Sequence, residues 1–108
     1  MRRAARIDAN QNRIVDALRY AGATVQSLAG LGNGVPDLLI GYKGVTVLME
    51  LKDGSKPPSE RSLTPLQLDW HGKWNGGTLC VVTDVESALR VLKVIGLAKH
   101  RTEQLNLS

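Results

Sequence analysis

Two short apolar runs, residues 37–42 and 45–51, constrain the fold of this chain more than any other feature. Only Lys43-Gly44 separates them, and a two-residue connection between apolar runs predicts an antiparallel β-hairpin. In this register Asp37 lies directly opposite Glu50. The first turn residue must then adopt a positive φ although it is a lysine, which is unfavourable for a side chain with a Cβ.

Two longer turns stay open as alternatives. A four-residue loop over 41–44 would place Asp37 opposite Leu48, and a three-residue loop would need a bulge to restore the alternation. Both even-length turns keep Asp37, Glu50 and Lys52 on one face of the hairpin. The shared face is therefore a firmer prediction than the register.

The two faces of the hairpin differ in character. Alternation along the strands gives one face that is almost wholly apolar and predicts a core: Leu38, Ile40, Tyr42, Val45, Val47, Met49 and Leu51. The other face carries Asp37, Glu50 and Lys52. Directly opposed residues have Cβ atoms about 5 Å apart, so two carboxylates placed there repel each other unless a positive group lies beside them. A divalent cation would satisfy this requirement.

Composition narrows the class of protein. A chain of 108 residues with 43% hydrophobic residues is long enough for one packed domain. Cys80 is the single cysteine, which excludes an internal disulfide, and a buried, inert thiol is favoured over a reactive one. No stretch approaches the ~20 apolar residues of a membrane span, so we expect a soluble, intracellular protein. The net charge of +4 favours a polyanionic partner.

The segment before the hairpin predicts a helix and a strand. Asp8 is followed three residues later by Gln11, a variant of the capping box, and Gly22 is expected to end this helix. Gln11 falls on the inward face of the helix, which makes it a candidate site residue. Residues 23–28 predict a strand.

Basic residues at two places are candidate contacts to a DNA backbone. Arg2 and Arg3 belong to a lead-in that is either a mobile arm or a solvated helix start. Lys56 and Arg61 lie in the segment 53–62, which we expect to be an exposed loop, and their alternative role is simple solvation.

Thr64, Pro65 and Gln67 predict the start of a second helix that runs to about Trp74, with a capping residue, proline at the first position and glutamine at the third. Gln67 has two interpretations, as the partner of the Thr64 cap and as a site residue. Trp70 and Trp74 are expected to close the core, with stacking on a base as the alternative. His71 is expected at the surface.

The remaining sequence predicts a fourth strand over 78–82 and a final helix that Asp84 caps and Gly96 ends. Residues 97–108 form a weakly patterned tail, either frayed or docked on a partner. We therefore expect a single α/β domain over 1–108, with a motif-bearing core at about 8–96. Its order is α-β-β-β-α-β-α, with a mixed sheet flanked by helices.

The shared face suggests metal chemistry. Mg²⁺ and Mn²⁺ prefer oxygen ligands and are typically held by one or two carboxylates together with water and substrate phosphate. Asp37 and Glu50 supply two carboxylates, and the carbonyl of Leu51 is a candidate third ligand. Lys52 would orient or deprotonate the nucleophile and offset developing charge.

These residues carry a resemblance to a known family. Gly34-Val35-Pro36-Asp37 followed by Glu50-Leu51-Lys52 resembles the PD-(D/E)xK nuclease pattern. Together with Leu63-Thr64-Pro65-Leu66-Gln67 and Trp70, it is similar to the stand-alone branch of the VRR-NUC (virus-type replication-repair nuclease) domains. The similarity covers residues 8–88.

The resemblance implies a restriction-endonuclease-like fold with Asp37 and Glu50 as ligands of Mg²⁺ or Mn²⁺, Lys52 as the catalytic lysine and Gln67 as a supporting site residue. Many relatives carry a metal-binding glutamate on the first helix, but here no glutamate precedes Glu50. Gln11 is the candidate for that place. The family also implies a homodimer that cuts branched DNA such as a Holliday junction, in the cytoplasm of a bacterial or phage-infected cell.

Three hypotheses follow from the sequence. The first is a metal-dependent DNA endonuclease of replication, recombination or repair. The second is a DNA-binding or assembly module that keeps the nuclease fold with little or no activity. The third is a surface ion pair between Glu50 and Lys52, which leaves the acid opposite Glu50 without an explanation.

Overall fold

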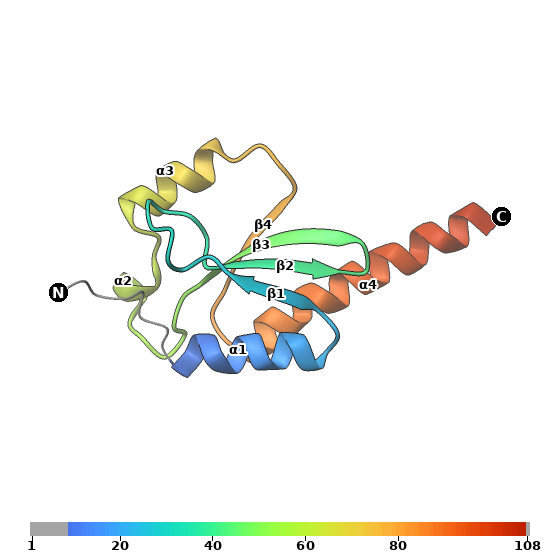
Figure 1. The fold of residues 1–108 in the computed structure, drawn as a ribbon, viewed down its shortest axis with the longest axis horizontal. Coiled ribbons are helices and arrows are strands. Elements are labelled where there is room, and N and C mark those ends of the chain that lie inside the picture. Colours follow the sequence, from blue (N-terminus) through green and yellow to red (C-terminus); the bar gives the residue numbers. More distant parts are fainter. Residues whose placement is uncertain (1–8, 108) are drawn as a thin grey trace.

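A four-stranded mixed sheet with helices on both sides forms this molecule, and the computed structural model describes residues 9–107 (Figure 1). The strand order is β1-β2-β3-β4; β2 pairs antiparallel with both β1 and β3, and β4 pairs parallel with β3. The elements are α1 (Ala9–Tyr20), β1 (Thr24–Ser27), β2 (Leu38–Tyr42), β3 (Val45–Leu51), α2 (Pro58–Arg61), α3 (Pro65–Lys73), β4 (Thr78–Val82) and α4 (Val85–Leu107). The expected α/β class is confirmed, and the arrangement is consistent with a restriction-endonuclease-like fold.

The hairpin has the predicted two-residue turn. Tyr42 pairs with Val45 and Leu38 pairs with Met49, which excludes the longer loops. Lys43 adopts a φ of 50° and Gly44 a φ of 80°, so both turn residues are left-handed. The lysine accepts this conformation because a turn with two positive φ values matches the right-handed twist of the strands on either side.

The hydrophobic core lies between the sheet and the pair α1 and α4. Its buried members come from the predicted apolar hairpin face and from the facing helices: Ile14, Leu18, Ala23, Val25, Leu38, Ile40, Val47, Met49, Val82, Ala88 and Leu92. Tyr42, Val45 and Leu51 pack against this cluster, so the predicted core face is confirmed. The opposite side of the sheet faces α3 (Figure 1).

Two predicted element boundaries were wrong. The expected loop over 53–62 contains the one-turn helix α2, which adds an eighth element. The last helix does not end at Gly96 but continues to Leu107. Glycine inside a helix costs only about 1 kcal/mol relative to alanine, which the good helix formers around it can offset. Gly22, which has a φ of 104°, does follow the end of α1 as predicted.

The tryptophans of α3 were placed wrongly. Neither Trp70 nor Trp74 belongs to the hydrophobic core, and Trp74 is 39% exposed. α3 lies on the side of the sheet away from this core (Figure 1) and buries none of its residues. Asp8, Arg2 and Arg3 lie outside the described residues. None of the helices in the described part of the chain has the length and apolar character that a membrane crossing requires.

Candidate functional site

Asp37 and Glu50 meet where β2 begins and β3 ends. The Asp37 carboxylate accepts a hydrogen bond from the backbone N–H of Leu51 at 2.8 Å, which fixes it beside the end of β3. The backbone of Asp37 also accepts a bond from the N–H of Leu28 at 2.7 Å, just beyond β1. Glu50 is 1% exposed. The hairpin register therefore brings the two predicted acids together.

Burial dominates the electrostatics of Glu50. Burial, together with a hydrogen bond to Asp37 and the charge of Asp37, raises the pKa of its carboxyl to about 8, and the charge of Lys52 opposes the shift. Near neutral pH Glu50 therefore keeps a proton unless an additional positive charge stabilises its ionised form.

Gln67 joins the predicted site residues with both ends of its amide. Its oxygen accepts a hydrogen bond from Lys52 Nζ at 2.7 Å, and its Nε2 donates to Glu50 Oε2 at 3.1 Å. The same oxygen accepts from the Thr64 N–H at 2.9 Å, while Thr64 Oγ1 accepts from the Gln67 N–H at 3.2 Å, which completes the capping box. The two interpretations of Gln67 are thus geometrically compatible.

His71 is a site neighbour that was expected at the surface, and this expectation was wrong. Its Nε2 lies 3.6 Å from Glu50 Oε1, and its side chain is only 13% exposed. Burial lowers the pKa of the imidazole and the charge of Lys52 lowers it further, which favours the neutral form of His71. The missed signal was its spacing, because residues four apart on a helix share a face and Gln67 was already a candidate.

Gly34 explains why α3 can approach the hairpin so closely. Its φ is 84°, and a Cβ at this position would collide with the backbone carbonyl of Leu66 in the first turn of α3. The loop before Asp37 therefore lies directly against the turn that carries Gln67. The glycine of the Gly34-Val35-Pro36-Asp37 motif has a packing role next to the two acids.

Gln11 lies on the buried face of α1, as predicted. Its side chain is 7% exposed, and its Nε2 donates to Ser27 Oγ at 3.5 Å, at the end of β1. Its proposed place in the metal site stays a prediction.

The candidate DNA contacts of the segment after β3 differ in exposure. Lys56 is exposed, whereas Arg61 is half-buried in α2. Arg61 lines a hollow of about 460 Å³ together with Arg13 and Asp53. Figure 1 shows α2 at the same end of the molecule as the starts of α1 and α3.

The donor set fits a hard cation such as Mg²⁺ or Mn²⁺. Two carboxylates converge, and Glu50 Oε1 is buried without a hydrogen-bond partner, which leaves it available as a ligand. Within residues 9–107 no group of three His, Cys, Asp or Glu side chains is arranged to hold a metal. A cation at Asp37 and Glu50 would therefore complete its shell with backbone or amide oxygens, water and substrate phosphate.

One of three comparisons with known proteins found a similar structure. A scan against models of protein families gave no match, and a search of curated proteins also found none. A search of solved structures found a "VRR_NUC domain" with a TM-score of 0.58 and 26% sequence identity, over 77% of this chain and 89% of that one. The match supports a nuclease-family domain, and the mixed sheet flanked by helices is consistent with a restriction-endonuclease-like fold. The match supports the more particular assignment of the chain as a VRR-NUC domain protein.

Proposed function

We propose that this protein is an endonuclease that hydrolyses DNA phosphodiester bonds with Mg²⁺ or Mn²⁺, selectively at branched structures such as Holliday junctions. The observation that carries the proposal is the Gln67 amide, which links the Lys52 ammonium to the Glu50 carboxyl beside Asp37. An isolated ion pair on a sheet edge needs neither a second acid nor a buried glutamate. The arrangement therefore favours catalysis over the surface ion pair.

Asp37 and Glu50 would hold the cation, with the Leu51 carbonyl and Gln11 as further candidate ligands. When bound, the metal would polarise the phosphate and lower the pKa of a coordinated water. The hydrogen bond from Leu51 keeps the Asp37 carboxylate in place. Glu50 must release its proton to act as an anionic ligand, which its raised pKa makes unfavourable in isolation.

Lys52 is the residue we expect to act on the nucleophile. Gln67 Oε1 holds its Nζ at 2.7 Å, so the ammonium is oriented before substrate arrives. From there it can position a water or hydroxide and stabilise the negative charge that develops on the phosphate. Lys56, Arg61, Arg2 and Arg3 are proposed contacts to the DNA backbone.

Cleavage assays test this proposal directly. Purified protein with Mg²⁺ or Mn²⁺ should cut a synthetic junction or flap faster than a linear duplex. Lys52→Ala should abolish cleavage while DNA binding persists, and Lys93→Ala, an exposed change on α4, should cut like the parent. A folded protein that leaves every substrate intact would contradict the nuclease proposal. Cleavage retained in Lys52→Ala would remove Lys52 from the mechanism.

The competing function is a DNA-binding or assembly module without catalysis. The observation in its favour is that no glutamate precedes Glu50 in the sequence, and Gln11, the candidate for that place, brings no charge. Calorimetric titration with Mn²⁺ separates the two. The nuclease proposal requires binding that disappears in Asp37→Asn and Glu50→Gln, whereas the module requires no such binding.

We also propose a homodimer. The support is a groove of about 880 Å³ between β4, at the edge of the described sheet, and α4. Val81 and Val94 line this groove with exposed apolar side chains. Two copies joined there would present two sites to the strands of one branched DNA.

A further inference from the structure

The two tryptophans of this chain form a ring stack that continues the candidate site along α3. Their ring centroids are 5.2 Å apart and their planes differ by 14°. Trp70 also meets the His71 ring edge-on, with centroids 6.4 Å apart and planes at 75°. Because His71 lies against Glu50, a continuous series of rings leads from the acidic pair to the exposed Trp74.

The orientation of Trp74 is fixed although the ring has no core to fill. Its indole N–H donates to the carbonyl of Gly77 at 2.9 Å, and its backbone N–H donates to the carbonyl of Trp70 at 3.1 Å. A Cβ on Gly76 would collide with the six-membered part of the ring. The glycine thus lets the indole lie over the turn. A rigid, half-exposed aromatic ring loses little freedom when a flat partner binds.

The helix places this stack at a definite distance from the site. One stripe holds Gln67, Trp70 and His71 of α3 and Trp74, its C-cap residue, at spacings of three, four and seven residues from Gln67. At 1.5 Å per residue, Trp74 lies about 10 Å along the helix from Gln67. Stacked nucleotides rise about 3.4 Å each, so this distance spans about three of them.

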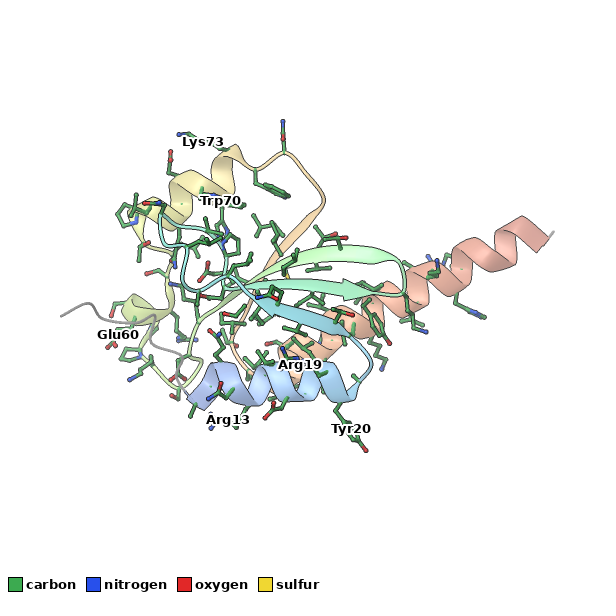
Figure 2. The ribbon with its side chains drawn as sticks, in the orientation of Figure 1. Arg13, Arg19, Tyr20, Glu60, Trp70 and Lys73 are labelled. Carbon is green, nitrogen blue, oxygen red and sulfur yellow. The ribbon has the colours of Figure 1, made fainter. Side chains whose placement is uncertain are left out.

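α3 exposes Leu66 and Leu68, which are 61% and 58% exposed, but its exposed charged side chains do not suit a protein partner that covers the whole helix. Figure 2 shows Trp70 on the side toward the sheet and Lys73 on the opposite side. Lys73 pairs with Asp69 at 3.1 Å, and both side chains are exposed. Charged residues are depleted in the cores of protein interfaces, whereas a single base needs only the exposed part of one ring, and Trp74 is 39% exposed.

We propose that the Trp70–Trp74 stack receives an unpaired base of the DNA strand whose phosphate lies at Asp37 and Glu50. This inference rests on the proposed nuclease function and specifies its substrate class. The preferred DNA has unpaired nucleotides within about three positions of the cleaved bond, as at a flap, fork or open junction. A fully paired duplex offers the stack no free base face.

Intrinsic fluorescence reports on the proposed contact, because Trp70 and Trp74 are the only tryptophans in the sequence. We expect a single-stranded oligonucleotide, added to the full chain in EDTA, to quench the fluorescence and a blunt duplex of equal length to do so much less. Trp74→Ala should weaken single-strand binding about fivefold or more, while duplex binding changes less than about twofold. Trp74→Phe should recover most of the loss.

Tyr20→Ala is the matched control, since Tyr20 is 96% exposed and points away from the sheet at the far end of α1 (Figure 2). It should bind both DNA forms like the parent. Circular dichroism melts of each variant establish that it is folded. If Trp74→Ala is unfolded, the proposal is tested by comparing the affinities of the parent and of Trp74→Phe for single-stranded and duplex DNA.

The outcomes separate this inference from the nuclease proposal. Metal-dependent cleavage without selective quenching, and with normal cutting of flaps by Trp74→Ala, would overturn the stack as a base site and leave the nuclease intact. Selective quenching without any cleavage would support the base site and reject the nuclease. A change of oligomeric mass in Trp74→Ala, with unchanged single-strand affinity, would assign the stack to a protein interface and overturn the proposal.

Discussion

The burial of Glu50 opposes its proposed role. Its surroundings exclude water, which disfavours the ionised carboxylate, whereas a metal ligand needs the negative charge. The glutamates of unfolded chains titrate near 4.5, whereas the folded pKa is about 8. Between these values the folded protein binds more protons than the unfolded chain. Stability contributed by protonated Glu50 is therefore full below about pH 4.5 and is lost as the pH rises through about 8.

We predict that the free energy of unfolding in EDTA falls between about pH 6.5 and about pH 8. At lower pH His71 has the opposite effect on the free energy of unfolding. Because its pKa is lowered in the folded state, stability rises with pH as the imidazole loses its proton. Urea denaturation at several pH values measures the slope. Glu50→Gln should remove it, and Glu60→Gln, an exposed change on α2, should preserve it. A slope of the opposite sign in the parent would contradict the assigned pKa of Glu50.

Gln67 allows its two roles to be separated by substitution. Glutamate at the third helical position can still complete a capping box, so Gln67→Glu should keep α3. It cannot donate to the Glu50 carboxyl, and a hydrogen bond to a charged group contributes about 1.5–3 kcal/mol. We expect cleavage to fall about tenfold or more.

Thr64→Ala is the complementary change. It removes the cap and leaves the Gln67 side chain facing Glu50 and Lys52, so it should cost about 0.5–2 kcal/mol of stability with little effect on cleavage. Thermal melts and initial cleavage rates of both variants provide the comparison. If Gln67→Glu and the parent cleave at equal rates, Gln67 serves only to cap α3 and has no role in cleavage.

At the scale of elements, the position of α3 depends on a glycine that lies outside it. Gly34→Ala would combine the strain of a positive φ with a collision against Leu66, so we expect α3 to shift and carry Gln67 away from Lys52. The matched control is Gly32→Ala. Gly32 has a φ of 67° and no atoms within 4 Å of the position that a Cβ would occupy, so it isolates the backbone strain.

We expect Gly32→Ala to cost about 1 kcal/mol and to cut normally, and Gly34→Ala to cost more and to lose cleavage. Denaturant melts and cleavage rates measure both effects, and tryptophan fluorescence reports on the surroundings of α3. If the two variants behave alike, close packing of the loop on α3 is not what holds the site together.

Helices and strands that depend on local rules could be predicted from the sequence. The hairpin, its core face and the capped start of α3 depend on local rules, namely alternation, turn length and the spacing of Thr64 and Gln67. His71 and the tryptophans were misplaced because helical spacing tells which residues share a face but not whether that face meets a core. The end of α4 was misplaced because glycine stops a helix only where the chain adopts a left-handed conformation.

For the whole molecule, the distribution of apolar surface bears on assembly. The extents are 59 × 30 × 27 Å, and the second half of α4 projects beyond the sheet (Figure 1). The groove between β4 and α4 is lined in part by Val94, which is 59% exposed. An edge strand beside an open apolar groove is a surface that natural proteins usually cover.

We predict that the parent protein is a dimer and that Val94→Asp makes it monomeric. A charge in the groove would be buried between two copies, where the cost of desolvation exceeds what a pair with Arg90 or Lys99 of the groove lining returns. Because Val94 is exposed in the single chain, the monomer should remain folded. Lys93→Asp, next to it but outside the groove lining, should keep the dimer. Light scattering after size exclusion gives the masses. A monomeric parent, or a Val94→Asp variant that is still a dimer, would show that two copies do not associate through this groove. Paired cutting of a branched DNA would then need another contact between copies.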